Sequence, residues 1–188
     1  EVLCLKNSYK SLSITEKYLS QRPFFSEMAH LVPSHRNENK ALHDLAHKAC
    51  KALGISLGIA HVEIKIKDDK AYIIEVGART GGDGIMDQIE NAFDVNPYFL
   101  HISSYLGKDL KEFTMPSAKR SCAIAFLKAR EGKIKKINEL KNIPKELSSI
   151  KITAKLGDES KVAKDWSARE GVVEFVFKEL LKKRVFCL

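Results

Sequence analysis

Residues 58–84 read GIAHVEIKIKDDKAYIIEVGARTGGDG, and this stretch decides the fold that the sequence predicts. Two runs of alternating apolar and polar residues flank an Asp-Asp-Lys turn at 68–70, a pattern typical of a β-hairpin. With three residues in the turn, the register places Glu63 directly opposite Glu75 on one side of the hairpin. The other pairs expected on that register are Lys67 with Ala71, Lys65 with Ile73, and His61 with Gly77.

The two sides of this hairpin differ in character. The apolar side is expected to face a core and comprises Val62, Ile64, Ile66, Tyr72, Ile74 and Val76. On the polar side, two carboxylates about 5 Å apart repel each other by about 3 kcal/mol at an effective dielectric constant of about 20. Lys65, in a diagonal cross-strand position, is expected to offset part of this repulsion. A divalent cation compensates better, because paired carboxylates with open positions for phosphate are typical of a magnesium site.

A glycine-rich loop follows the second strand. Arg79 lies four residues after Glu75 and precedes Gly81-Gly82-Asp83-Gly84. A guanidinium presents a planar fork to phosphate, and the backbone N–H groups of such a loop can approach an anion closely. A helix predicted over residues 85–93 would point its N-terminal dipole at the same place. The alternative interpretation is a solvated hairpin face followed by an ordinary helix-start turn.

The segments HVEIK and IIEVGARTGGD resemble the catalytic end of the ATP-grasp superfamily, whose enzymes join a carboxylate to an amine, or another nucleophile, through an acyl phosphate. The resemblance implies ATP, and magnesium (or manganese in its place) held by Glu63 and Glu75, which stand 12 residues apart in many members and here. One departure is Gly77, which stands where the family usually has Asn. One magnesium position would then be coordinated by Glu75 and water, without a side-chain ligand from position 77.

The same resemblance implies roles for the loop. Arg79 would contact the nucleotide, the substrate and the transferred phosphate. The backbone N–H groups of Gly81 and Gly82 would hold the developing oxyanion, and Gly82 would also touch substrate. Asp83 would act as a base, by analogy with a carboxylate at that offset in biotin-carboxylase-like members.

A second motif lies in residues 24–32, FFSEMAHLV, an expected extended segment that ends at Pro33. Glu27 and His30 resemble the F-x-E-x-x-H-x-x-P strand of the L-amino-acid ligase branch, in which they line the substrate pocket. Their odd separation places them on opposite faces of a regular strand, so a bulge or strand end must lie between them if both reach one pocket. A His beside a Glu can orient or deprotonate an ammonium nucleophile. The alternative is an exposed Glu and a half-buried His.

Other elements follow from caps and periodicity. An amphipathic helix is expected over residues 39–53, ended by Gly54, and another begins at Asn96-Pro97 and ends at Gly107. His43 and His47 have the spacing of a zinc helix, but no third ligand is evident, and they are expected to be solvated.

The chain opens inside an apolar run, EVLCL, and an Asn7-Ser8 turn leads to a second run over residues 9–18, which predicts an initial hairpin. We expect a fragment of a longer polypeptide, with the missing N-terminal half as its partner. The adenine-contacting and phosphate-covering segments of the family would lie upstream, and residues 1–188 alone are expected not to turn over.

The C-terminal part is expected to be separate. A linker at 111–117 suggests domains at residues 1–114 and 115–188. Strands are expected over 120–129, 133–137, 150–154 and 171–177, with a short helix around Glu139. The predicted fold class is α+β: the C-terminal half of an ATP-grasp domain, with a mostly antiparallel sheet packed with helices, followed by a small C-terminal α/β domain.

The composition of the 188 residues, 44% apolar and 30% charged, is that of a soluble globular protein. Scattered cysteines at positions 4, 50, 122 and 187 indicate reduced thiols and a cytoplasmic location. The net charge of +8 is spread over dispersed lysines without a nucleic-acid motif, so neither nucleic acid nor membrane is an expected partner.

The resulting functional prediction is an ADP-forming carboxylate–amine ligase of the L-amino-acid ligase type. Its expected substrates are an amino-acid-like carboxylate and amine, bound by Glu27, His30, Arg79 and Gly82, and a homodimer is a further expectation. Alternatives are purine-biosynthetic, carbamoyl-phosphate-synthase-like or biotin-carboxylase-like ATP-grasp enzymes. An alternative of another class is a non-catalytic nucleotide-binding module.

Overall fold

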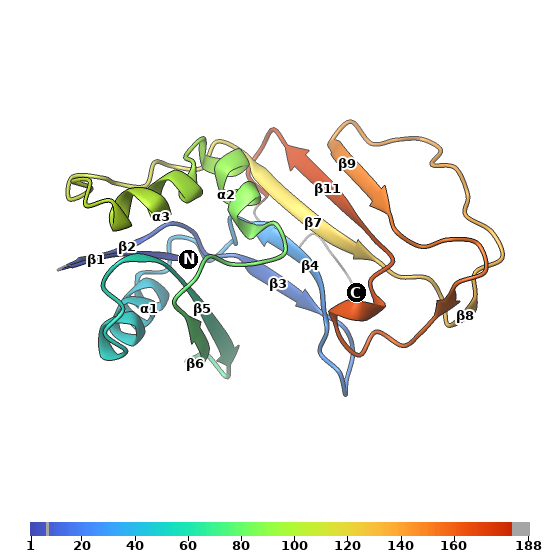
Figure 1. Ribbon diagram of the computed structural model, residues 1–188, viewed down its shortest axis with the longest axis horizontal. Coiled ribbons are helices and arrows are strands. Elements are labelled where there is room, and N and C mark those ends of the chain that lie inside the picture. Colours follow the sequence, from blue (N-terminus) through green and yellow to red (C-terminus); the bar gives the residue numbers. More distant parts are fainter. Residues whose placement is uncertain (7, 182–188) are drawn as a thin grey trace.

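The computed structural model describes residues 1–6 and 8–181 (Figure 1). Asn7, in the expected first turn, and Cys187 therefore lie outside the described residues. Two antiparallel sheets form the framework, and helices pack against both of them (Figure 1). Among the described residues, no helix is long and apolar enough to cross a membrane.

The first sheet has the strand order β2-β1-β5-β6. Its strands are β2 (Ser8–Ser11), β1 (Val2–Leu5), β5 (Gly58–Lys67) and β6 (Lys70–Gly77). Helix α1 (Lys40–Ala52) packs on this sheet through Ala46 and Cys50, which meet Val2, Cys4 and Ala60 in one buried cluster. As predicted, α1 begins after Asn39, whose side chain accepts a hydrogen bond from the Leu42 N–H, and Gly54 follows its end with φ 69°.

The β5–β6 hairpin has a different turn from the expected one. Asp68 and Asp69 both have positive φ, 50° and 57°, and form a two-residue turn that pairs Lys67 with Lys70. The expected pairs Lys67–Ala71 and Lys65–Ile73 are therefore wrong. A β-bulge between Glu63 and Ile64 then inserts one extra residue into β6 and shifts the register back. The observed pairs beyond the bulge are Glu63 with Glu75, Val62 with Val76, and His61 with Gly77, as predicted.

This register also changes which apolar side chains are buried. Val62, Ile64 and Val76 pack against the cluster beneath α1, as expected. Ile66, Tyr72 and Ile74 are instead 40%, 48% and 55% exposed. Tyr72 pairs with Lys65 and thus shares its side of the sheet, because the two-residue turn moved it by one position.

The second sheet has the order β3-β4-β7-β11-β9. Its strands are β3 (Glu16–Leu19), β4 (Glu27–Val32), β7 (Ser121–Leu127), β11 (Gly171–Phe177) and β9 (Leu147–Ile152). The expected run 9–18 is thus divided between β2 and β3, in different sheets. Strands from both sides of the linker at 111–117 share this sheet, and the division into domains after residue 114 stays a prediction.

Helices α2 (Ile85–Phe93) and α3 (Pro97–Tyr105) occupy the predicted positions. Asn96 caps α3 by accepting a hydrogen bond from the Phe99 N–H. The buried side chains of α2 contact residues from both sheets, in a cluster formed by Leu3, Leu12, Val32, Ile59, Ile85, Met86, Ile89, Ala92, Phe93, Leu100 and Cys122. This cluster fixes the start of α2, and the loop before it, at the junction of the two sheets.

Two predictions for the C-terminal part are wrong. The return strand is only β8 (Gly132–Lys133), and it pairs with β10 (Glu159–Ser160) rather than with β7. No helix forms around Glu139; the one helical element beyond residue 115 in the described chain is the 3₁₀ turn η1 (Trp166–Ala168). Ile137, Leu140 and Ile143 have helical spacing but are 40–63% exposed, and a short helix without a packing surface is unstable.

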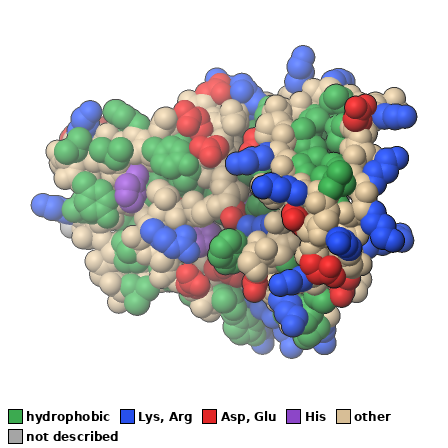
Figure 2. Space-filling view, turned by 45° about the vertical axis from the view of Figure 1, so that its right-hand side comes forward, with side chains coloured by type: hydrophobic (Ala, Val, Ile, Leu, Met, Phe, Trp, Pro, Cys, Tyr) green, Lys and Arg blue, Asp and Glu red, His purple; other side chains and the backbone are tan. Residues whose placement is uncertain are grey.

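The described cysteines, Cys4, Cys50 and Cys122, are buried and free, in agreement with the expected reduced thiols. Charge on the molecular face of Figure 2 is mixed, with Asp and Glu side chains lying among the Lys and Arg side chains.

Candidate active site

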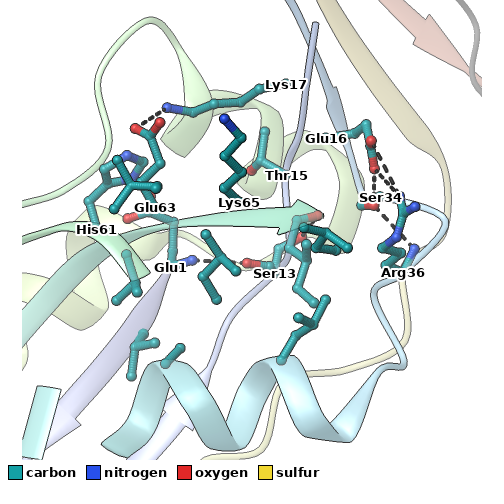
Figure 3. A pocket seen from close by; sticks show the side chains of 18 of the residues that line it. Glu1, Ser13, Thr15, Glu16, Lys17, Ser34, Arg36, His61, Glu63 and Lys65 are labelled. Atoms are coloured by element: carbon teal, nitrogen blue, oxygen red, sulfur yellow. Dashed lines mark hydrogen bonds and ion pairs between the residues drawn. The ribbon is translucent and has the colours of Figure 1, made fainter. Parts of the chain in front are cut away.

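The polar side chains singled out from the sequence gather where the hairpin, β3–β4 and the loop before α2 meet. A cavity of about 560 Å³ opens there, and its lining includes Glu1, Lys17, Glu27, His61, Glu63 and Lys65 (Figure 3). Residues from four separated segments therefore share one solvent-accessible space. Of the predicted site residues, Glu27 and Glu63 line this cavity, whereas His30, Glu75, Arg79 and Asp83 lie outside its lining.

Lys17, which the sequence analysis did not single out, links the two predicted motifs. Its Nζ lies 2.5 Å from Glu27 Oε1 and 3.1 Å from Glu63 Oε2 (the latter contact is drawn in Figure 3). Burial alone lowers the pKa of Lys17, but its contacts with both carboxylates outweigh burial and raise it. Lys17 pairs with His30 across β3 and β4, so its position could be found only by knowing that pairing.

The two carboxylates of the hairpin are cross-strand neighbours, and each has a cation beside it. Lys17 neutralises Glu63, whereas Glu75 lies 3.6 Å from the Arg79 guanidinium. No ion pair involves Lys65 in the described chain, so the expected compensation by Lys65 is wrong. Glu75 is 60% exposed and Glu63 36% exposed. Two accessible carboxylates on adjacent strands are oxygen donors of the kind that magnesium prefers, so these residues fit the expected metal.

Arg79 folds back over Gly77. A Cβ at position 77 would lie 3.2 Å from Arg79 Cγ and 3.7 Å from its Cζ, and Arg79 Nη1 donates to the Thr80 carbonyl at 3.1 Å. The absent side chain at position 77 thus makes room for the guanidinium beside Glu75.

Glu27 and His30 do reach one site, because a β-bulge lies between them, as their odd separation required. A β-bulge in β4 pairs Tyr18 with Ala29 but Leu19 with Glu27, which leaves Met28 as the extra residue. Glu27 Oε2 then lies 3.1 Å from His30 Nε2. Hydrogen bonds from His30 and Lys17 outweigh burial and lower the pKa of Glu27 to about 2.

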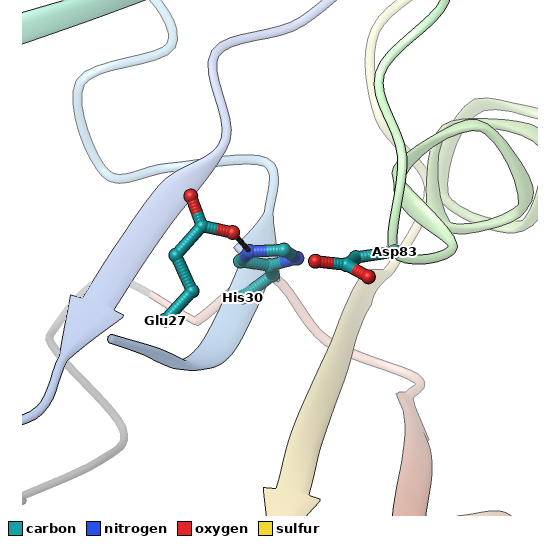
Figure 4. Close-up of side chains that lie close together, drawn as sticks. All are labelled: Glu27, His30 and Asp83. Atoms are coloured by element: carbon teal, nitrogen blue, oxygen red, sulfur yellow. Dashed lines mark hydrogen bonds and ion pairs between the residues drawn. The ribbon is translucent and has the colours of Figure 1, made fainter. Parts of the chain in front are cut away.

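The imidazole of His30 is fully buried and lies between two carboxylates, Glu27 and Asp83 (Figure 4). Its Nδ1 points toward Asp83 and has no hydrogen-bond partner within residues 1–6 and 8–181. Ligand atoms of the three residues lie within 4.8 Å of one another. Because the two ring nitrogens face different carboxylates, and both carboxylates already have cations, the arrangement suits proton transfer better than metal binding.

Arg169 forms an ion pair with Asp83, and no pattern in the sequence indicates this role. Its Nη1 lies 2.8 Å from Asp83 Oδ1, and its Nη2 donates to the Glu27 carbonyl at 3.1 Å. The guanidinium also lies 3.6 Å from the centre of the Phe126 ring, a cation–π contact that holds it in place. Arg169 reaches the site from the segment before β11, so only the tertiary fold reveals it.

The glycine loop differs from its expected role at one position. The Gly81 N–H donates to Glu1 Oε2 at 3.1 Å, so in this arrangement it is not free to bind a ligand. The Gly82 N–H has no acceptor among the described residues. His43 and His47, which have the spacing of a zinc helix, are half-buried rather than solvated as expected. His43 hydrogen-bonds to the Asn37 carbonyl, and His47 hydrogen-bonds to the Ser11 hydroxyl.

Comparisons with known proteins show which fold this chain has. An ATP-grasp domain family matches residues 6–87. The fold is similar to an L-amino acid ligase from Bacillus licheniformis, with a TM-score of 0.78 and 24% identity over 95% of this chain and 46% of that chain. It is also similar to phosphoribosylglycinamide synthetase from Anaerococcus prevotii, with a TM-score of 0.76 and 18% identity over 95% of this chain and 47% of that one.

A third similar structure is the biotin carboxylase domain of a Hydrogenobacter thermophilus 2-oxoglutarate carboxylase, in complex with MgADP, ADP and bicarbonate. Its TM-score is 0.60 at 15% identity, over 93% of this chain and 40% of that chain. A search of curated proteins found no match. The chain spans less than half the length of each of these three structures, and at these identities the likeness shows the fold.

Proposed function

We propose that this chain, which has the ATP-grasp fold and contains part of an ATP-grasp domain, is the catalytic portion of an ADP-forming carboxylate–amine ligase. The observation that carries the proposal is the Lys17 bridge between Glu63 and Glu27. It joins the hairpin carboxylates that suit a metal–phosphate site to the buried His30 that suits an amine. Similarity of fold supports an ATP-dependent ligase in general, and the side chains support this subtype.

In the proposed reaction, the γ-phosphate of ATP passes to a carboxylate, an amine displaces phosphate from the acyl phosphate, and ADP and phosphate leave. Glu63 and Glu75 would hold magnesium, or manganese in its place, which would neutralise phosphate oxygens when bound. Arg79 is 57% exposed beside Glu75, so its guanidinium can turn from that carboxylate to the transferring phosphoryl group. The Gly82 N–H would stabilise the oxyanion.

The second half of the reaction needs a proton acceptor. An amine substrate arrives as an ammonium ion, which the negatively charged Glu27 and Asp83 attract. One proton must leave before the nitrogen attacks. The Asp83 carboxylate, which is 39% exposed, is positioned to take it and to pass it to the buried His30 Nδ1 beside it. Arg169, whose Nη1 lies 2.8 Å from Asp83 Oδ1, holds the Asp83 carboxylate in place. We infer amino-acid-like carboxylate and amine substrates from this charge pattern.

Trapping the intermediate tests the proposal. The protein that includes the upstream half of an ATP-grasp enzyme is incubated with ATP, Mg²⁺ and candidate amino acids, and ADP release is measured. Hydroxylamine is added as a second nucleophile, because it converts an acyl phosphate into a hydroxamate. Hydroxamate formation that depends on ATP and a carboxylate supports the ligase. Binding of ATP without ADP release under any pair would instead show a non-catalytic nucleotide-binding module.

A matched control uses residues 1–188 alone. The chain spans less than half of the similar ligases, and we propose that the absent half completes the nucleotide site. Residues 1–188 should therefore release no ADP. Turnover by the 188-residue chain would contradict that part of the proposal.

A further inference from the structure

The loop between β6 and α2 is held at two points by residues outside it. The His61 N–H donates to the Arg79 carbonyl at 3.0 Å, and the Gly81 N–H donates to Glu1 Oε2 at 3.1 Å. These contacts lie on either side of Thr80. The segment that presents Arg79 and Gly82 is therefore tied to β5 and to the start of β1.

The Glu1 carboxylate is buried, with its side chain only 2% exposed, and its second oxygen contacts His61 Nδ1. The Glu1 backbone is also fixed, because its carbonyl accepts from the Leu12 N–H at 2.9 Å.

Gly81 allows the carboxylate to approach this closely. A Cβ at position 81 would lie 2.5 Å from Glu1 Oε1 and 3.2 Å from His61 Nδ1. By contrast, a Cβ at Gly82 would meet no atom within 4 Å. The two neighbouring glycines therefore differ: Gly81 makes room for Glu1, whereas Gly82 has open space beside it.

We propose that Glu1 and His61 are positioning residues, which hold the glycine loop through the Gly81 N–H so that Arg79 and Gly82 face the reacting phosphate and carbonyl. A buried ion pair contributes little to stability compared with apolar residues of similar size, so its specific hydrogen bond to the loop is the better explanation for it. The catalytic consequence rests on the proposed ligase function, whereas the loop contact itself does not.

Amide hydrogen exchange tests the contact directly. In the 188-residue chain, NMR should show that the Gly81 amide exchanges at least about tenfold more slowly than the Gly82 amide. Glu1→Ala should remove this difference, while amides in α2 keep their rates. Glu1→Gln, which retains an acceptor oxygen, should keep part of the protection. Unchanged Gly81 exchange in Glu1→Ala would overturn the proposal.

His61 variants cover the case in which Glu1→Ala does not fold. The Asn amide nitrogen can take the place of Nδ1, so His61→Asn should keep Gly81 protected and His61→Leu should not. In the protein that includes the upstream half, His61→Leu should lower kcat at least about tenfold with a smaller change in the KM for ATP, and His61→Asn should restore most of kcat. Equal activity of the Leu and Asn variants would overturn the positioning role.

A double-mutant cycle adds a separate measurement. Gly81→Ala should be damaging because Ala Cβ meets Glu1, and it should cost less when Glu1→Ala is already present. Exchange is measured without any ligase assay. If Gly81 protection depends on Glu1 but no ligation occurs, the proposed function fails and the loop contact stands; if ligation occurs but exchange is independent of Glu1, the contact alone fails.

Discussion

Replacing Lys17 with methionine removes the cation that lies between Glu27 and Glu63, at 2.5 Å and 3.1 Å, while it keeps most of the side-chain volume. The pKa of Glu27 is about 2, compared with an ordinary value of 4.5. That difference corresponds to about 3 kcal/mol of stability at neutral pH, and this is an upper bound because Glu27 is 26% exposed and His30 supplies the largest contribution. The share of Lys17 is about 1–2 kcal/mol.

A loss of about 1–2 kcal/mol lowers the Tm of a domain of this size by about 3–6 °C, which differential scanning fluorimetry resolves. The matched control is Lys65→Met, because Lys65 lines the same cavity and has no ion pair in the described chain; it should change stability by less than about 0.5 kcal/mol. Equal Tm values for the two variants would refute the assigned role of Lys17.

Two conditions sharpen this test. Glu27 has a depressed folded pKa, so its contribution is present above its unfolded pKa and is lost as pH falls from about 4.5 toward about 2. In Lys17→Met the folded pKa of Glu27 should be higher, and acid unfolding should begin at a higher pH than in the parent. Removal of the ammonium also leaves carboxylates uncompensated, so Mg²⁺ or Mn²⁺ should raise the Tm of Lys17→Met more than that of the parent.

Three further substitutions test the site in the protein that includes the upstream half. Glu63→Gln should abolish turnover without unfolding the protein, because one of two repelling carboxylates is removed; normal rate and magnesium dependence would contradict the metal assignment. Arg79→Lys should lower kcat by about 10³-fold, or about 4 kcal/mol, with little change in KM, and an unchanged kcat would remove Arg79 from the mechanism. His30→Gln should still form hydroxamate but lose ligation to amino acids, whereas equal loss of both products would contradict its role on the amine side.

The pairing of Glu63 with Glu75 was predictable because strand alternation and short turns restrict the register strongly. The prediction was right although the turn was wrong, since the two-residue turn and the bulge between Glu63 and Ile64 shift the register in opposite directions. Nothing in local sequence separates that combination from a regular three-residue turn.

Helix caps were equally informative, because Asn39, Asn96 and Gly54 act on their own neighbours along the chain. Lys17, Arg169 and Glu1 escaped prediction for the opposite reason. Each reaches the site from a distant segment, and the local sequence around a single charged residue does not show which partner it will meet. Sequence reasoning therefore found the groups proposed to touch ligands and missed the groups that hold them.

The shared second sheet governs when the site can assemble as the chain is synthesised. β4, which carries Glu27 and His30, is made early, but its neighbour β7 and the Arg169 side chain come much later. At about 5–20 residues per second, β4 waits several seconds with one edge unpaired before β7 emerges. Asp83 gains its counter-ion later still, when residue 169 has left the ribosome. Glu27, Glu63 and Glu75 have their cationic partners within residues 17–79, so among the carboxylates of this site it is Asp83 whose pairing comes last.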